Sequence, residues 1–218
     1  MLVRPGMPRN VETVVTLPVA RRAITGFTLV ELMVTVTIIG LLIAILLPCL
    51  AQAQAVARQV VCLSNLRQIG LATQYYVRDN RSYPPTYVDS TCRWMDLLKP
   101  YVPKNCGVYR CPEDRNAIAC DWDPQIVLSY GMNTFNFTDN AHCFWYGVWS
   151  LDVCRPQQTI LLGDCTPGLY YCGGGRRFAD PVSCVDYRHP GKTFNALYCD
   201  GRVANLKTTA QRDWDAAQ

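Results

Sequence analysis

The sequence predicts an α+β protein in which a long N-terminal α-helix packs on a small antiparallel β-sheet head. Three observations predict this class. Residues 27–47 form an unbroken apolar run, residues 48–80 repeat apolar side chains every three or four positions, and residues 81–218 alternate short apolar stretches with turn signals. We therefore expect four segments: a leader at 1–26, a membrane-spanning helix at 27–47, its amphipathic continuation at 48–80, and a cysteine-rich globular head at 81–218.

Composition and charge argue against two classes of protein. Half of the 218 residues are apolar and 11% are aromatic, so a packed core is expected and wholesale disorder is not. The formal net charge is +4, but residues 1–26 hold four arginines against one glutamate, which leaves only +1 for the rest. Since no basic field remains, we expect no nucleic-acid partner.

The run from Phe27 to Leu47 has the length of a membrane span. Its 21 residues include one charged side chain, Glu31, and about 20 apolar residues suffice to cross the hydrocarbon layer. Arg21 and Arg22 immediately precede the run. The positive-inside rule therefore predicts a single pass with residues 1–26 in the cytoplasm and the head across the membrane.

Two ordinary interpretations of this run explain it incompletely. A secretory signal would end its apolar region at a small-residue cleavage site, whereas Gly26 comes before the run. A plain signal anchor would span the membrane, but it leaves the cost of placing Glu31 in the lipid unexplained. A third interpretation accounts for both residues.

Residues 26–34, which read GFTLVELMV, resemble the prepilin-peptidase site of type IV pilins and type II secretion pseudopilins. The resemblance implies that prepilin peptidase cuts between Gly26 and Phe27 and that the new N-terminal Phe27 is methylated. It also implies a role for Glu31 in assembly, as the counter-ion of the terminal amine of a neighbouring subunit. Elementary electrostatics agrees, because a buried amine and a buried carboxylate are each costly alone and pairing relieves both.

Beyond the span, the helix is expected to continue to about Val77 and to stop at the Ser-Tyr-Pro-Pro sequence of residues 82–85. Pro48, at a position where the pilin family often has a proline, should loosen the helix near residues 44–48 by deleting a hydrogen bond. The continuation shows one apolar face at helical spacing. This face comprises Val56, Val60, Leu63, Leu66, Ile69 or Gly70, Thr73 and Val77.

The head is expected to contain at least four short strands and one short helix. Apolar runs bounded by turn residues predict strands at 127–130, 159–162 and 194–198. Asp200 and Gly201 then predict a tight type I′ hairpin into residues 202–206. Residues 94–101 predict a short helix that stops at Pro100. Packing the sheet on the long helix would bury the apolar face of that helix.

Ten of the twelve cysteines lie between residues 92 and 199, and none of the twelve forms a CxxC pair. The absence of this spacing argues against a zinc ribbon or a thioredoxin-like site. An even spread of cysteines through a loop-rich region favours disulfides in an oxidising compartment. Reduced, buried cysteines are the alternative.

Several segments of the helix and the head resemble a large pilin-like family that is abundant in planctomycetes and related bacteria. They are residues 62–70, 83–85, 111–114, 130–133 and the C-terminal pair of His189 with Asp200-Gly201. The hallmark of that family is a histidine, nine residues and Asp-Gly, whereas ten residues separate His189 from Asp200 here. The resemblance implies a pilin-like architecture and no defined activity.

We expect no catalytic residues, no metal and no cofactor. His189 lacks a recognisable nucleophile partner in the sequence, so an enzyme is not predicted, and His189 is expected to be a hydrogen-bonded structural residue beside the Asp200 turn. Calcium is the one cofactor left open, because several aspartates lie near turns, although the chain lacks an EF-hand loop. These aspartates are Asp164, Asp180, Asp186 and Asp200.

The expected function is that of a structural subunit of a type IV pilus-like fibre or a type II secretion pseudopilus. The resemblance implies prepilin peptidase, other pilin subunits and the bacterial inner membrane as partners, with the head periplasmic or extracellular. The alternative is a membrane-tethered extracytoplasmic binding module that uses the prepilin export route without polymerising. Glu31 discriminates between the two, because only the polymer needs its charge.

Overall fold

The computed structural model describes residues 26–102, 106–135, 143–172 and 181–217. The chain divides into two compact units, Met1–Ile45 and Leu46–Gln218. One helix, α1 (Leu29–Asn80), contributes residues to both units. The second unit contains every strand that the structure describes, so the predicted α+β class is confirmed.

In the first unit, α1 is long and apolar enough to cross a membrane. The hydroxyls of Thr35 and Thr37 donate to the carbonyls of Leu32 (2.8 Å) and Met33 (2.7 Å) in the preceding turn. A threonine that bonds its own helix leaves no hydroxyl in need of water. The threonines are therefore compatible with a lipid environment.

In the second unit, α1 buries a face that begins later than the sequence predicts. Its buried residues are Cys62, Leu66, Ile69, Gly70, Ala72 and Thr73. Val56 and Val60, which were expected on this face, are 50% and 58% exposed. Leu66, Ile69 and Thr73 were predicted correctly, whereas helical periodicity alone could not show where along the helix the head begins to cover it.

The remaining elements of the head are short. After α1 come α2 (Trp94–Leu98), η1 (Cys106–Tyr109), β1 (Ile118–Ala119), β2 (Val127–Leu128), β3 (Tyr130–Asn133), β4 (Ile160–Asp164), β5 (Tyr171–Cys172), η2 (Pro181–Cys184), β6 (Phe194–Tyr198), β7 (Val203–Leu206) and η3 (Gln211–Trp214). The predicted helix at 94–101 is thus reduced to 94–98. The predicted strand at 127–130 is divided between β2 and β3.

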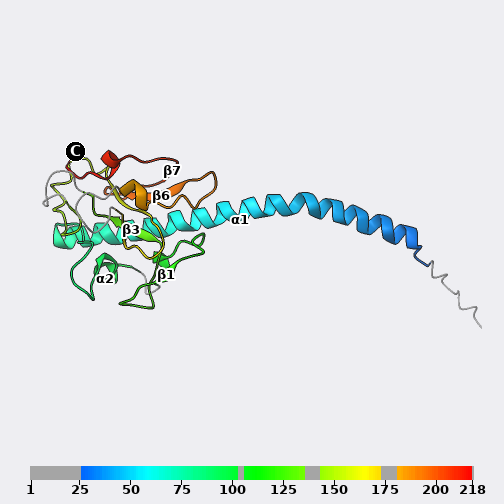
Figure 1. Cartoon of the computed structure of the whole chain (residues 1–218), viewed down its shortest axis with the longest axis horizontal. Coiled ribbons are helices and arrows are strands. Elements are labelled where there is room, and N and C mark those ends of the chain that lie inside the picture. The colour runs from blue at the N-terminus through cyan, green and yellow to red at the C-terminus, as the bar shows by residue number, and fades with distance from the viewer. Residues whose placement is uncertain (1–25, 103–105, 136–142, 173–180, 218) are drawn as a thin grey trace, which may run out of the picture. The chain divides into compact units, whose positions relative to one another are not determined.

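The main sheet has five strands in the order β5-β3-β4-β6-β7. β3 with β4, β4 with β6, and β6 with β7 pair antiparallel, which agrees with the predicted antiparallel sheet. Of these pairings, only that of β6 with β7 was predicted individually. β5 joins the edge parallel to β3, so the sheet is mixed. In Figure 1 the cyan part of α1 runs through the head among β3, β6 and α2.

The β6–β7 hairpin confirms the predicted turn at Asp200-Gly201 and corrects its type. The Tyr198 N–H donates to the Arg202 carbonyl (2.8 Å), so three residues form the loop. Among the described residues of this turn, only Gly201 has a positive φ, of 89°. A type I′ turn needs two such residues, whereas a three-residue loop needs one glycine in the left-handed conformation.

The sheet is buried on both faces. On one face, Met132, Leu162 and Leu197 share a core with the buried side of α1 and with α2. On the other face, Phe194 and Ala196 pack with Trp214 of η3 and with a group of cysteines. Alternation of side chains along β6 places neighbouring residues in different cores. The sequence predicted the packing of the sheet on α1. It did not predict that the C-terminal segment covers the other face of the sheet.

Candidate functional site

The predicted cleavage site lies at the first two residues that the structure describes. Gly26 and Phe27 precede α1, and Phe27 is 68% exposed. A side chain built on Gly26 would meet no atom within 4 Å. Packing within the described residues therefore gives no reason for a glycine at position 26.

Glu31 closes the first turn of α1. Its carboxylate accepts hydrogen bonds from the Thr28 N–H (2.9 Å) and the Thr28 hydroxyl (2.7 Å), and its own N–H donates to the Thr28 hydroxyl oxygen (3.2 Å). This reciprocal pattern is a capping box, which satisfies backbone N–H groups that a helix start leaves free. The positive end of the helix dipole also favours a carboxylate here. The carboxylate of Glu31 is thus bonded to Thr28, the residue that follows Phe27 in the sequence.

Pro48 lies inside α1 without ending it. A proline within a helix has no N–H to give to the carbonyl four residues earlier, which here belongs to Ala44. The boundary between the two compact units, after Ile45, falls beside this missing bond. The predicted loosening at residues 44–48 stays a prediction.

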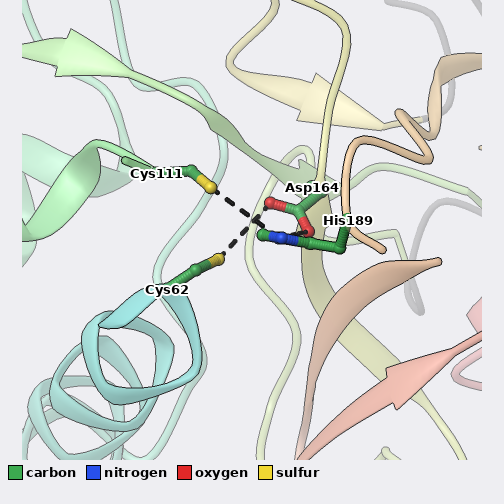
Figure 2. Close-up of side chains that lie close together, drawn as sticks. All are labelled: Cys62, Cys111, Asp164 and His189. Carbon is green, nitrogen blue, oxygen red and sulfur yellow. Dashed lines mark hydrogen bonds and ion pairs between the residues drawn. The ribbon is translucent and has the colours of Figure 1, made fainter. Parts of the chain in front are cut away.

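The head contains a buried cluster of four polar side chains from four separate segments. Cys62 comes from α1, Cys111 from the loop after η1, Asp164 from the end of β4, and His189 from the loop before β6. Figure 2 shows the two sulfurs, the carboxylate and the imidazole pointing toward one another. One potential ligand atom from each lies within 4.8 Å of every other, and all four residues are buried.

Short contacts connect the members of this cluster. His189 Nε2 lies 3.1 Å from Asp164 Oδ2 and 3.7 Å from Cys111 Sγ. Cys62 Sγ lies 3.6 Å from Asp164 Oδ1. The side-chain amide of Asn195 also lies 2.9 Å from His189 Nε2.

Local structure fixes each of these side chains. Cys62 lies on the buried face of α1, and the Asp114 N–H closes a turn on the Cys111 carbonyl (3.0 Å). The Asn195 N–H donates to Asp164 Oδ2 (2.7 Å). A two-way backbone bridge between His189 and Thr193 (3.0 and 3.3 Å) holds the loop that carries the imidazole.

The cluster shifts the pKa values of its members in opposite directions. Burial raises the pKa of the Cys62 thiol well above its ordinary value. The hydrogen bond from Cys62 lowers the pKa of Cys111 to about 6 against the opposing effect of burial, and His189 adds to this lowering. Burial alone would lower the pKa of His189, but its contacts with Asp164 and Cys111 raise it to about 9. Thiolate character at Cys111 is therefore favoured inside the head.

This arrangement differs from a nucleophile–base relay. In such a relay, one histidine nitrogen faces the nucleophile and the other faces an orienting carboxylate. Here the same nitrogen, Nε2, faces both Cys111 and Asp164. Nδ1 is buried and has no hydrogen-bond partner among the described residues. The four groups converge on one point instead of forming a chain.

Comparison with known proteins identifies the N-terminal segment. A model described as the prokaryotic N-terminal methylation motif matches residues 21–47, which contain Gly26, Phe27 and Glu31. The type II secretion system core protein G of Pseudomonas aeruginosa is 38% identical over 66 residues, which are 30% of this chain and 46% of that protein. The N-terminal segment thus carries a prepilin-type methylation motif and is similar to part of a type II secretion protein.

The head is less well matched. A family described as a protein of unknown function (DUF1559) matches residues 51–102, which cover the second half of α1 and α2. The chain spans less than half the length of the secretion protein that it resembles. No solved structure matches the chain.

His189 and Asp200 do not form one site. His189 precedes β6 and contacts Asp164, whereas Asp200 follows β6 and accepts a hydrogen bond from the Arg202 N–H (2.9 Å). A five-residue strand separates them by roughly 16 Å at the usual rise per residue. The prediction that His189 lies beside the Asp200 turn is therefore wrong. Asp200 and Gly201 serve the hairpin.

The described aspartates considered for calcium do not bring their carboxylates together, although the Asp186 N–H donates to the Asp164 carbonyl (3.0 Å). Asp164 lies in the buried cluster, Asp186 pairs with Arg188 (3.0 Å), and Asp200 caps its own turn. Asp180 lies outside the described residues. The described aspartates thus give no support for a calcium site.

The disulfide prediction also fails where the structure describes cysteine side chains. The eleven cysteines described in this way, Cys106 not being among them, are all free. Three members of the buried cluster, Cys62, Cys111 and His189, stand in segments that the sequence analysis singled out for a family resemblance. Asp164 stands in a strand-ending Gly-Asp pair. Those segments were the one sequence signal that could have pointed to the cluster. That they meet in space could not be deduced from their order along the chain.

Proposed function

We propose that this chain is a pseudopilin-like precursor and that it serves as a structural subunit. Prepilin peptidase removes residues 1–26 by cutting between Gly26 and Phe27, and the amine of Phe27 is methylated. The apolar part of α1 then assembles the subunit into a type IV pilus-like fibre or a type II secretion pseudopilus. The observation that carries the proposal is a carboxylate, Glu31, held at the first turn of a helix that is long and apolar enough to span a membrane.

The capping box supports this role for Glu31. Bonding to Thr28 lowers the cost of a carboxylate in lipid before assembly, because two donors of the same turn already satisfy one of its oxygens. Its other oxygen remains available to the ammonium of an adjacent subunit. Pairing of two costly charges would fix the axial register, since a slipped subunit would leave both unpaired.

The proposed partners follow from this assembly. They are prepilin peptidase, further pilin-type subunits that pack through α1, and the bacterial inner membrane. Arg21 and Arg22 favour a cytoplasmic N-terminus, so the head would lie in the periplasm or at the cell surface. The role is structural and non-enzymatic.

The test is a pair of variants in the native host. Glu31→Leu removes the charge, and Thr37→Val removes a polar group that already bonds its own helix. We expect both variants to be cleaved and inserted in the membrane. We expect only Thr37→Val to appear with wild type in the fraction of sheared fibres, or in the cross-linked oligomers of a pseudopilus.

N-terminal sequencing and intact mass measure the processing step separately. A mature chain that begins with methylated Phe27 agrees with the proposal, and an uncut chain from Met1 or Met7 refutes it. If Glu31→Leu assembles like wild type, the pairing role of Glu31 is wrong. If wild type is processed but stays monomeric in the membrane, the tethered binding module is the better description.

A further inference from the structure

We propose that Cys62, Cys111, Asp164 and His189 bind one Zn²⁺ ion in a closed structural site inside the head. Nothing in the N-terminal motif requires such a site. The inference rests on the donor atoms, on their spacing and on their burial.

The spacing of the donor atoms fits a tetrahedral ligand shell. Zinc binds sulfur at about 2.3 Å and nitrogen or oxygen at about 2.0–2.2 Å, so neighbouring ligand atoms of a tetrahedron lie about 3.3–3.8 Å apart. Two of the separations lie in this range, 3.7 Å from Cys111 Sγ to His189 Nε2 and 3.6 Å from Cys62 Sγ to Asp164 Oδ1. All four donor atoms lie within 4.8 Å of one another, so the longest edge would shorten by up to about 1 Å when the ion binds. The distance from His189 Nε2 to the other oxygen of Asp164 is 3.1 Å.

Hydrogen bonds alone account poorly for this convergence. Asp164 and His189 do have short polar contacts, with the Asn195 N–H 2.7 Å from Asp164 Oδ2, His189 Nε2 3.1 Å from that oxygen, and the Asn195 amide 2.9 Å from Nε2. The two sulfurs are what these bonds leave unexplained, because a thiol is a weak donor and a weak acceptor and its contacts with this pair are 3.6 and 3.7 Å. The same separations are the expected edges of a metal-centred tetrahedron. A single central cation would satisfy all four groups at once.

The donor set selects the metal. Two sulfurs, one imidazole nitrogen and one carboxylate oxygen are ligands that zinc accepts together, and tetrahedral sulfur–nitrogen sites are typical of zinc. All four ligands come from the protein and all four residues are buried. A site without an open position is structural, since catalytic zinc keeps one position for water or substrate.

Neighbouring groups hold the ligands in place. The Tyr130 hydroxyl donates to Cys62 Sγ (3.3 Å). The Asn195 N–H binds Asp164 Oδ2 (2.7 Å), which leaves Oδ1 directed toward Cys62 and the centre of the cluster. Outer hydrogen bonds of this kind orient ligands and tune the affinity for the metal.

The site would connect the helix that polymerises to the domain that it carries. Its ligands join α1 to three segments that reach from residue 111 to residue 189. A metal that binds the folded head, and that finds no preformed site in the unfolded chain, adds its binding free energy to folding. The ion would also keep Cys62 and Cys111 from oxidation in a compartment that favours disulfides.

The first test uses the full chain, purified in detergent without a polyhistidine tag. Elemental analysis should find about one zinc ion per chain. X-ray absorption at the zinc edge should show two sulfur ligands at about 2.3 Å and two nitrogen or oxygen ligands at about 2.0–2.2 Å. These measurements need no variant, so they remain decisive if a ligand substitution prevents folding.

The second test locates the site. Cys62→Ser and Cys111→Ser should lower zinc content at least about tenfold, because a lost thiolate removes a ligand from a site that has no spare one. Cys154→Ser is the matched control, since Cys154 is exposed and lies outside the cluster. It should retain the zinc content of wild type. A chelator should make Cys62 and Cys111 of the wild-type chain reactive to alkylation, and added zinc should protect them again.

Four results would overturn the proposal. The first is a chain that is purified without zinc and binds none when zinc is added, and the second is copper or iron in place of zinc. The third is an absorption spectrum without two sulfur ligands, and the fourth is full zinc content in both cluster variants. A disulfide between Cys62 and Cys111, seen by mass spectrometry without reductant, would also exclude the site. None of these results bears on cleavage at Gly26 or on Glu31, so the proposed function is tested independently.

Discussion

Gly131 lies at a point in the head where the structure leaves no room for a side chain. It stands in β3 opposite Gly163 of β4. A Cβ atom on Gly131 would lie 2.7 Å from Cys165 Sγ, 2.8 Å from Cys172 Sγ and 2.8 Å from the carbonyl carbon of Tyr171. Real Cβ atoms essentially never approach heavy atoms this closely. The third contact is to backbone, so no side-chain rotation relieves it.

We therefore expect Gly131→Ala to destabilise the head strongly. Overpacking a well-packed core costs about 1–3 kcal/mol, and three simultaneous contacts place this substitution near the upper end, at about 3 kcal/mol. With a urea m-value of about 2 kcal/mol/M, the unfolding midpoint should fall by about 1.5 M. All five tryptophans lie between residues 94 and 214, so their fluorescence reports unfolding of the head in the full chain.

Gly163→Ala is the matched control on the neighbouring strand. Its Cβ would meet one atom at 3.0 Å, Cη2 of Trp214, and the next at 3.7 Å. A single side-chain contact can shift by a few tenths of an ångström, so the midpoint should fall by roughly 0.5 M or less for a cost of about 1 kcal/mol. Equal midpoints for the two variants would refute the reasoning, because β5 and Cys165 would then not lie against Gly131.

Two further substitutions test α1. Leu66→Ala removes a fully buried side chain between the helix and the sheet and should lower the free energy of unfolding by about 2–5 kcal/mol in the same urea assay. Val60→Ala, at a position 58% exposed, should change it by less than about 0.5 kcal/mol. Similar losses for both variants would show that Val60 belongs to the buried face, as the sequence predicted. Pro48→Ala restores an N–H for the Ala44 carbonyl. Amide hydrogen exchange should therefore slow around residues 44–52, while the urea midpoint of the head stays unchanged. Exchange at the wild-type rate would show that Pro48 does not loosen the helix.

The linear pattern of residues was sufficient for the elements that local forces decide. The length of the apolar run at residues 27–47 predicted a membrane-spanning helix. The one carboxylate in that run, Glu31, is the residue that discriminates between a polymer subunit and a tethered module. The helix from Leu29 to Asn80, the strand from Phe194 to Tyr198 and the turn at Asp200-Gly201 follow from short-range periodicity and turn chemistry. Glu31 of the capping box lies three residues from Thr28, so this contact too is local.

Contacts between distant residues were beyond that reasoning. The buried face of α1 begins at Cys62 and not at Val56, because the extent of the head decides which turns it covers. The cysteines were assigned to disulfides from their number and their even spread through a loop-rich region. Their free state, and the convergence of Cys62 and Cys111, depend on how the loop after η1 returns to the helix.

What the sequence alone determined is a helix with a membrane-length apolar segment, a carboxylate in its first turn and a small sheet domain after it. These features depend on residues a few positions apart, where spacing along the chain equals spacing in the structure. Only the tertiary structure decided that His189 meets Asp164 and two cysteines rather than Asp200. The physical reason is that strand pairing brings together side chains that are far apart in the sequence. An extended strand also keeps residues at its two ends apart although they are close in the sequence, as at the two ends of β6.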